Sequence, residues 1–393
     1  MNYEFTDKTK KILFAMMGIG VLAFVYALVR GIPGQRIWAN LLLDIFFFLT
    51  LAIGATFYMA KKYAAEASYA IVYKRVYEAI SGYLPVGVVM LFLFLVCGFL
   101  GLHHIYKWQD HSLYAEDKIL ANKAPYFNPI FYWARFALYF GGAIYAQYRL
   151  RKRSLEEDLT GDIKLHWKNI TTSAGFLVLF GFITPVMVWD VIMSVDVHWF
   201  STMFGWYVLA GFWCTTMVVI MLLSLHLKDK GYLPEMNDNH FHDLGKWVFA
   251  LSFLWTYTFF CQFMLIWYAN IPEEVTYFHD RIDAMGYRPL FWIMFFINFS
   301  FPMLLLMSRD AKRNASTLKF IGGLLIFVHW LDVYVMIMPG TVGEGWRVFS
   351  PFELGLLIGF AGLFLYVVLG QLAKAPIIVQ KHPYLDESKH HQI

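Results

Sequence analysis

The chain alternates between long apolar runs and short polar stretches. Each run has close to the 20 residues that a helix needs to cross the hydrocarbon core of a bilayer. We therefore predict an all-α fold, a polytopic membrane protein with a single integral membrane domain over residues 1–393 and a polar tail at 373–393. The ten predicted transmembrane helices lie at about residues 12–29, 37–60, 84–102, 129–148, 170–189, 203–225, 246–269, 290–307, 318–338 and 352–372.

The composition agrees with this pattern. Of the 393 residues, 59% are hydrophobic and only 15% are charged, whereas about 25% are charged in soluble domains. The net charge of +4 is too small to indicate a nucleic-acid partner. The first apolar run follows a polar N-terminus and lacks a small-residue cleavage site after it, which favours a transmembrane helix over a signal peptide.

The basic residues predict the orientation in the membrane. Ten spans place both termini on one side, and that side carries 23 Lys and Arg residues against 8 on the other, with Arg135 inside the fourth span. Cytoplasmic loops carry the excess of basic residues, so we expect both termini in the cytoplasm. On the same side, residues 63–80 could form an amphipathic helix lying on the membrane interface, and the tail is either disordered or docked on a partner.

Five ionisable residues fall within the predicted spans or at their ends. A charge near the bilayer centre costs roughly 3 kcal/mol on insertion scales, so each needs a structural or functional reason. The direction of each span places all five in the non-cytoplasmic half of the membrane. They are Asp44, Arg135, His329, Asp332 and Glu353.

The strongest candidate pair is His329 with Asp332. Three residues apart on one helix, they share a face and can touch. A histidine titrates near neutral pH and a carboxylate beside it can orient it, so the pair suits proton handling: accepting protons from a quinol and passing them outward. A structural pair that satisfies itself between helices is an equally good interpretation.

The remaining candidates for a quinone site or a proton path are weaker. Arg135 is expected to snorkel to the surface rather than form a site. Asp44 and Glu353 lie close enough to span ends to face water. The outer loops contribute Asp190, Asp196, His198, Glu273 and Arg347.

Ligands for redox cofactors are missing from the sequence pattern. The three cysteines, Cys97, Cys214 and Cys261, form no C-x-x-C motif, which excludes iron–sulfur ligation and covalent haem attachment. Haem b in a membrane bundle normally takes two histidines on facing helices, and only His329 lies well inside a span. We expect no covalent cofactor and no metal ligands in this chain, and a quinol such as menaquinol as the candidate ligand.

Three stretches carry a resemblance to a known family. They are WDVIMSVDVHWFSTMFGWY at 189–207, WYANIPEE at 267–274 and HWLDVYVMIMP at 329–339. With ten spans and both termini inside, the whole chain resembles the second large membrane subunit of bacterial alternative complex III, the ActF family. That family is related to membrane subunits of the NrfD and polysulfide-reductase type.

The resemblance implies two four-helix bundles, formed by spans two to five and six to nine, with one further helix at each end. It implies a bacterial inner-membrane subunit of a quinol:cytochrome c oxidoreductase that is not catalytic alone and contributes a quinone-side cavity or an outer proton path. The implied partners are a homologous quinol-binding membrane subunit, an iron–sulfur protein and multihaem cytochromes c, with lipid and a terminal oxidase as further contacts. Two other interpretations stay open, an ion-coupled secondary transporter and a purely structural anchor of such a complex.

Overall fold

The computed structural model describes residues 2–283, 286–343 and 350–392. Within these ranges the chain is helical and forms no β-strand. The long helices are α1 (Asp7–Val29), α2 (Gly34–Ala64), α4 (Leu84–Phe99), α6 (Pro129–Thr160), α7 (Ile163–Val191), α8 (Thr202–Asp229), α9 (Asp238–Ala269), α11 (Tyr287–Leu305), α12 (Ala315–Val342) and α13 (Pro351–Ala373). The short ones are α3 (Lys74–Ser81), α5 (Lys118–Lys123), α10 (Pro272–Ile282) and α14 (Leu385–Lys389), with 3₁₀ turns η1 (Ser68–Ala70), η2 (Lys107–Gln109), η3 (His111–Ala115) and η4 (Met193–Val195).

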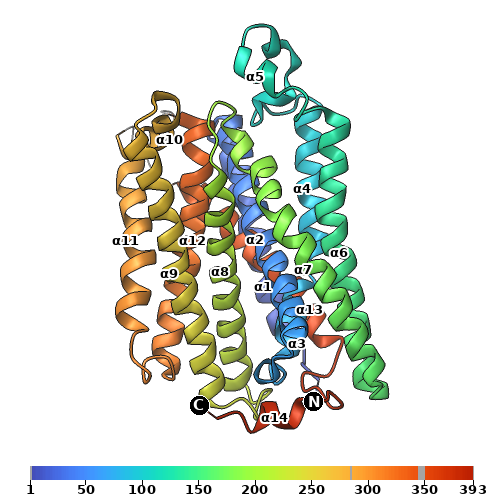
Figure 1. Cartoon of the computed structure of the whole chain (residues 1–393). Coiled ribbons are helices and arrows are strands. Elements are labelled where there is room, and N and C mark those ends of the chain that lie inside the picture. Colours follow the sequence, from blue (N-terminus) through green and yellow to red (C-terminus); the bar gives the residue numbers. More distant parts are fainter. Residues whose placement is uncertain (1, 284–285, 344–349, 393) are drawn as a thin grey trace.

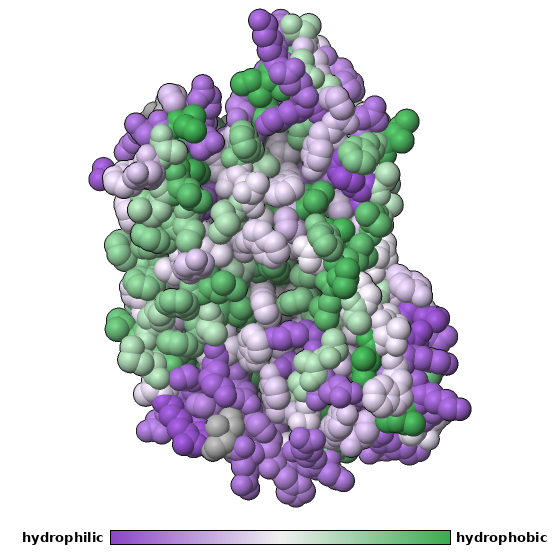
Figure 2. All heavy atoms as spheres, viewed as in Figure 1, coloured by the Kyte–Doolittle hydropathy of each residue, from purple (hydrophilic) through white to green (hydrophobic). Residues whose placement is uncertain are grey.

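Among the described residues, nine helices are long and apolar enough to cross a membrane, with α3 and α4 together forming one of them. This confirms the prediction of an all-α, multi-pass membrane protein. The long helices run side by side (Figure 1), and an apolar band separates two polar ends (Figure 2). The other long helix, α6, has an apolar part interrupted by tyrosines and by Arg135, which lowers its hydropathy.

Both termini lie at one end of the molecule, which we call the N/C end; the opposite end is the far end (Figure 1). Several helices are preceded by a capping residue whose side-chain oxygen accepts a hydrogen bond from a backbone N–H of the first turn. These N–H groups have no acceptor within the helix itself. These capping residues are Asn128, Asp162, Asn237, Asn314 and Ser350.

The helices pack in recognisable groups. Helices α8, α9, α11 and α12 contact one another in a ring, α2 lies against α4, α6 and α7, and α2 also contacts α8 and α12. Helices α1 and α13 pair with each other, and α13 also contacts α2 and α3. The backbones of α1 and α13 approach so closely that a Cβ on Gly20 would lie 2.7 Å from the Cα of Gly359, which is the small-residue packing typical of membrane helices.

The N/C end differs from two expectations. The predicted interfacial helix is buried instead: all eight residues of α3 are shielded by neighbouring elements, because its charged side chains have partners in the protein. Arg75 donates to Glu78, Ser154 and Asp158. The polar side chains of α3 therefore form part of the protein interior rather than a membrane-facing stripe.

The tail is docked on the chain itself, so the expectation of a disordered tail was wrong, and docking on a partner stays a prediction. Backbone N–H groups of Gln380 and Lys381 donate to Asp158 Oδ1, and His391 lies 2.7 Å from Asp243. These contacts fold the last residues back beneath the helices, where α14 is seen in Figure 1.

At the far end, α10 closes over α12. Pro339 lies inside α12 and has no N–H to donate to the carbonyl of Val335. The buried side chain of Arg281 supplies the missing donors, to Val335 O at 3.0 Å and to Met336 O at 2.9 Å. This contact fixes the far-end portion of α12.

Candidate functional site

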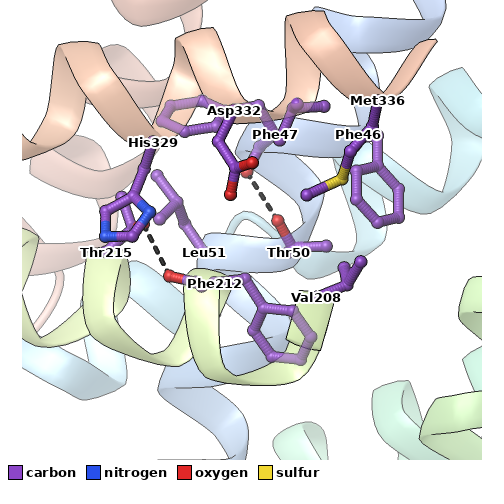
Figure 3. A pocket seen from close by; sticks show the side chains of 12 residues that line it. Phe46, Phe47, Thr50, Leu51, Val208, Phe212, Thr215, His329, Asp332 and Met336 are labelled. Atoms are coloured by element: carbon purple, nitrogen blue, oxygen red, sulfur yellow. Dashed lines mark hydrogen bonds between the residues drawn. The ribbon is translucent and has the colours of Figure 1, made fainter. Parts of the chain in front are cut away.

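A small cavity lies in the middle of the molecule, between α2, α8 and α12 (Figure 3). Its polar lining comes from Thr50 on α2, Thr215 on α8, and His329 and Asp332 on α12; the other lining groups are almost all apolar. The free space accommodates about one water molecule. It is therefore a place for water or a proton, and too small as it stands for a quinone ring.

Asp332 is held by two donors from other helices. It is 2% exposed, and its carboxylate accepts hydrogen bonds from the hydroxyl of Tyr207 on α8 and, at 2.9 Å, from Nε1 of Trp255 on α9. Gly211 makes room for this arrangement, since a Cβ there would lie 3.3 Å from the Trp255 ring. The carboxylate thus joins α8, α9 and α12 at one point.

His329 has no such partner. It is 3% exposed, and neither ring nitrogen forms a hydrogen bond with any described residue. Its ring is nearly perpendicular to that of Trp255, at a centroid distance of 5.9 Å. A buried polar ring without partners is unusual in a native protein and calls for a functional or solvent explanation.

The predicted direct contact between His329 and Asp332 is absent among the described residues. The spacing does place both side chains at the same cavity (Figure 3). The carboxylate, however, turns to Tyr207 and Trp255, because the phenol and indole groups on facing helices donate hydrogen bonds to it. The two residues are neighbours across a water-sized space rather than a bonded pair.

Asp44 is also buried rather than facing water. It is fully shielded on α2 and accepts a hydrogen bond at 2.8 Å from Nε1 of Trp330, while its second oxygen has no described partner. Trp330 directly follows His329 on α12, so Asp44 contacts the same turn of that helix through a different residue.

Glu353 is buried for a structural reason. Its Oε1 accepts from Arg36 Nε at 2.7 Å, and its Oε2 accepts from the backbone and hydroxyl of Ser350. Glu353 thereby completes a capping box at the start of α13. The water-facing alternative for this residue was wrong, and its carboxylate is saturated.

Arg135 does not snorkel. It forms a two-point ion pair with Asp190, with Nε to Oδ2 at 2.8 Å and Nη2 to Oδ1 at 3.0 Å. The hydroxyl of Tyr139 donates to the same carboxylate, and the third guanidinium nitrogen donates to the carbonyl of Tyr126. Asp190 is fully buried, so the pair ties α6 to α7 inside the protein.

The loop candidates lie at the far end, away from the cavity. His198 is exposed and 2.5 Å from Asp117. A hydrogen bond from the backbone N–H of Leu120 holds the pKa of Asp117 below its ordinary value, so this carboxylate is a stable anionic partner. Asp196 is partly buried, Glu273 is exposed in the first turn of α10, and Arg347 lies outside the described residues.

The predicted residues thus form separate groups rather than one cluster. All the described span residues do lie toward the far end or the middle, as expected from their positions along the helices. Three residues that supply hydrogen-bond donors to the buried carboxylates were not predicted: Tyr207, Trp255 and Arg36. Tyr207 closes the stretch 189–207, but nothing in the pattern distinguishes Trp255 from the other 13 tryptophans.

Comparison of the chain with protein-family models and with curated proteins finds no match.

Proposed function

We propose that this chain is a non-haem membrane subunit of a respiratory quinol:cytochrome c oxidoreductase of the alternative complex III type, and that it carries a proton path through its outer half. One observation carries the proposal. A buried histidine without hydrogen-bond partners shares a water-sized cavity with a buried carboxylate.

The chemistry of proton transfer accounts for this arrangement. An imidazole can take up a proton at one nitrogen and release one from the other. Transfer to a neighbouring group can run through a single water, and the cavity between His329 and Asp332 has room for one. Thr50 and Thr215 line the same space. Their hydroxyls donate to the carbonyls of Phe47 and Gly211, so each can accept a hydrogen bond from that water.

We assign quinol binding to the homologous quinol-binding membrane subunit of such a complex rather than to this cavity. Small-molecule sites enclose roughly 300–1,000 Å³ and bury most of the ligand, whereas here the free space matches about one water. In this proposal the chain receives protons released near it and delivers them toward the far end.

The proposal includes a topology of ten crossings. Nine crossings would leave the termini at opposite ends, yet both lie at the N/C end (Figure 1), so α6 is taken as the tenth. Helices α2, α4, α6 and α7 would form one four-helix bundle and α8, α9, α11 and α12 the other, flanked by α1 and α13. The basic asymmetry supports an N/C end in the cytoplasm of a bacterium, with the far end outside.

A structural anchor is the second candidate, and specific contacts favour it. The ion pairs of Arg135 with Asp190 and of Arg36 with Glu353 leave their carboxylates fully bonded. Such groups hold helices together and have no free position for proton transfer. If the central site served the same purpose, the chain would act only as a scaffold.

Isolation of the assembled complex tests the proposed function. A tagged full chain, extracted in mild detergent, should bring with it c-type haem absorbance, an iron–sulfur signal and quinol:cytochrome c activity. Stripped of its partners, the chain should show no Soret band. Recovery of a chain that transports ions alone after reconstitution, with no haem proteins attached, would refute the proposal in favour of a transporter.

A further inference from the structure

Three side chains meet at the N/C end, two from one helical hairpin and one from the distant tail. Glu157 is near the end of α6, His166 is in the first turns of α7, and His382 is in the tail between α13 and α14. Helices α6 and α7 are joined by a tight turn in which Gly161 adopts a left-handed conformation (φ 73°). The hairpin brings Glu157 and His166 together, and the docked tail adds His382.

The three side chains offer ligand atoms to one point. One oxygen of Glu157, one ring nitrogen of His166 and one of His382 all lie within 4.8 Å of one another. His166 Nδ1 is 3.3 Å from Glu157 Oε1, and the two imidazole rings are 5.1 Å apart and nearly perpendicular. Small side-chain rotations would bring the three atoms to the bond lengths of about 2.0–2.2 Å that zinc requires.

Hydrogen bonding does not explain why these groups are buried. Glu157 and His166 are each 2% exposed and His382 is 6% exposed. Both carboxylate oxygens of Glu157 and both ring nitrogens of His166 have no hydrogen-bond partner among the described residues. Burying several polar atoms of one cluster without hydrogen bonds is costly, and the ion pairs of Glu157 with His166 and Lys74 still leave Nε2 of His166 without a partner among the described residues.

We propose that Glu157, His166 and His382 bind a divalent transition metal, zinc being the best match. Two imidazoles and one carboxylate are ordinary zinc ligands, and a site with three protein ligands keeps its fourth position for water. His166 and His382 themselves line a small cavity together with Tyr63, Tyr77 and Tyr384, and its free space matches at most about one water.

The surrounding charges shape this site. Lys74 Nζ lies 3.6 Å from Oε2 of Glu157 and competes for that oxygen, which leaves Oε1 for the metal. The neighbouring Arg75 is engaged by Glu78 and Asp158. Because the cationic surroundings disfavour loosely held hard cations, binding depends on the imidazoles, which zinc prefers and Mg²⁺ or Ca²⁺ does not.

The site would fasten the tail to the α6–α7 hairpin. This differs from the proton path, which lies in the middle of the molecule, and it contributes nothing to quinol oxidation directly. No metal ligands were expected, since residues 157, 166 and 382 show no ligand spacing in the sequence and come together only when the tail folds back.

Zinc content of the purified full chain tests the inference. The chain is saturated with Zn²⁺ in detergent, passed through a desalting column and assayed for bound zinc by mass spectrometry. We expect about one zinc ion per wild-type chain. The His382→Gln variant should retain about tenfold less bound zinc, or lower still. His382→Cys should retain zinc, since a thiolate is also a zinc ligand.

The control is His390→Gln. His390 is on the same tail, and its ring bonds only to the backbone of Asp386, so this variant should bind zinc like the wild type. Trypsin cleavage after Lys389 gives a second readout: zinc should slow it in wild type and His390→Gln but not in His382→Gln. Equal zinc in wild type and His382→Gln, or no zinc in the saturated and correctly folded wild type, would overturn the proposal.

Discussion

Two buried sites in this protein differ in how completely their polar and charged groups are hydrogen-bonded. The Arg135–Asp190 pair is saturated: each carboxylate oxygen accepts from the guanidinium, and Tyr139 adds a further donor. The central site satisfies Asp332 through Tyr207 and Trp255 but leaves both nitrogens of His329 without partners. The difference separates a contact that fixes helices from a group that is free to exchange a proton.

The comparison also shows what burial alone cannot indicate. Arg135, Asp190, His329 and Asp332 are all nearly or fully buried, yet only His329 has unused hydrogen-bonding capacity. A buried ion pair is weak evidence for function, because each charge is compensated by the other. An unpaired imidazole beside space for a water is stronger evidence.

The largest expected effect comes from removing one member of the saturated pair. Arg135→Ala leaves Asp190 as a buried, unpaired carboxylate, which should cost about 3–5 kcal/mol of folding free energy. The measurement is unfolding of the full chain in detergent, with the yield of assembled complex as a second readout.

The matched control replaces both charges with apolar groups of similar size. Arg135→Met combined with Asp190→Leu should recover most of the lost stability, since no charge then remains buried. Quinol turnover per intact complex should stay near the wild-type value. A selective loss of turnover in this double variant would place the pair in the proton path instead.

A smaller loss of folding stability is expected when Asp332 loses one of its hydrogen-bond donors. Trp255→Phe removes one of its two donors and should cost about 1.5–3 kcal/mol, the range for hydrogen bonds to charged groups. The same unfolding assay measures it. Trp206→Phe is the control, because that tryptophan is on the exposed surface of α8 and its replacement should change stability little.

The smallest effect should come from the cavity wall. Thr215→Val keeps the shape of the side chain but removes a hydroxyl that lines the cavity. Stability should change by less than about 1.5 kcal/mol, whereas proton release during quinol oxidation should slow by about two- to fivefold, equivalent to roughly 1 kcal/mol of barrier. If proton release is unchanged, Thr215 takes no part in holding the water.

Much of the fold could be predicted from the lengths of the apolar runs. Runs of about 20 residues identify membrane helices because the bilayer thickness fixes their length. The pattern failed where tertiary contacts override it. The charges of Arg75 and Glu78 suggested a helix at the interface, but partners on α6 allow α3 to be buried. The tail was predicted to be disordered or docked on a partner, because its contacts with Asp158 and Asp243 join residues that are far apart in the sequence.

The site could be predicted only in part. Rarity of ionisable residues within spans pointed to His329 and Asp332, and both are buried, whereas the burial of Asp44 contradicts the water-facing alternative given for it. Helical spacing then suggested that His329 and Asp332 touch, but spacing fixes only the face on which side chains emerge. Which partner a carboxylate chooses depends on donors from other helices, here Tyr207 and Trp255, and a single sequence contains no record of which helices meet.

Proton release by the assembled complex carrying His329→Phe is the most direct test of the proposed path. The ring of phenylalanine fills a similar space without a titratable nitrogen, so turnover and proton release per intact complex should both fall by about tenfold or more. His104→Phe, at an exposed far-end position, should behave like the wild type. Wild-type turnover and proton release in His329→Phe would contradict the account and leave the chain as a structural anchor.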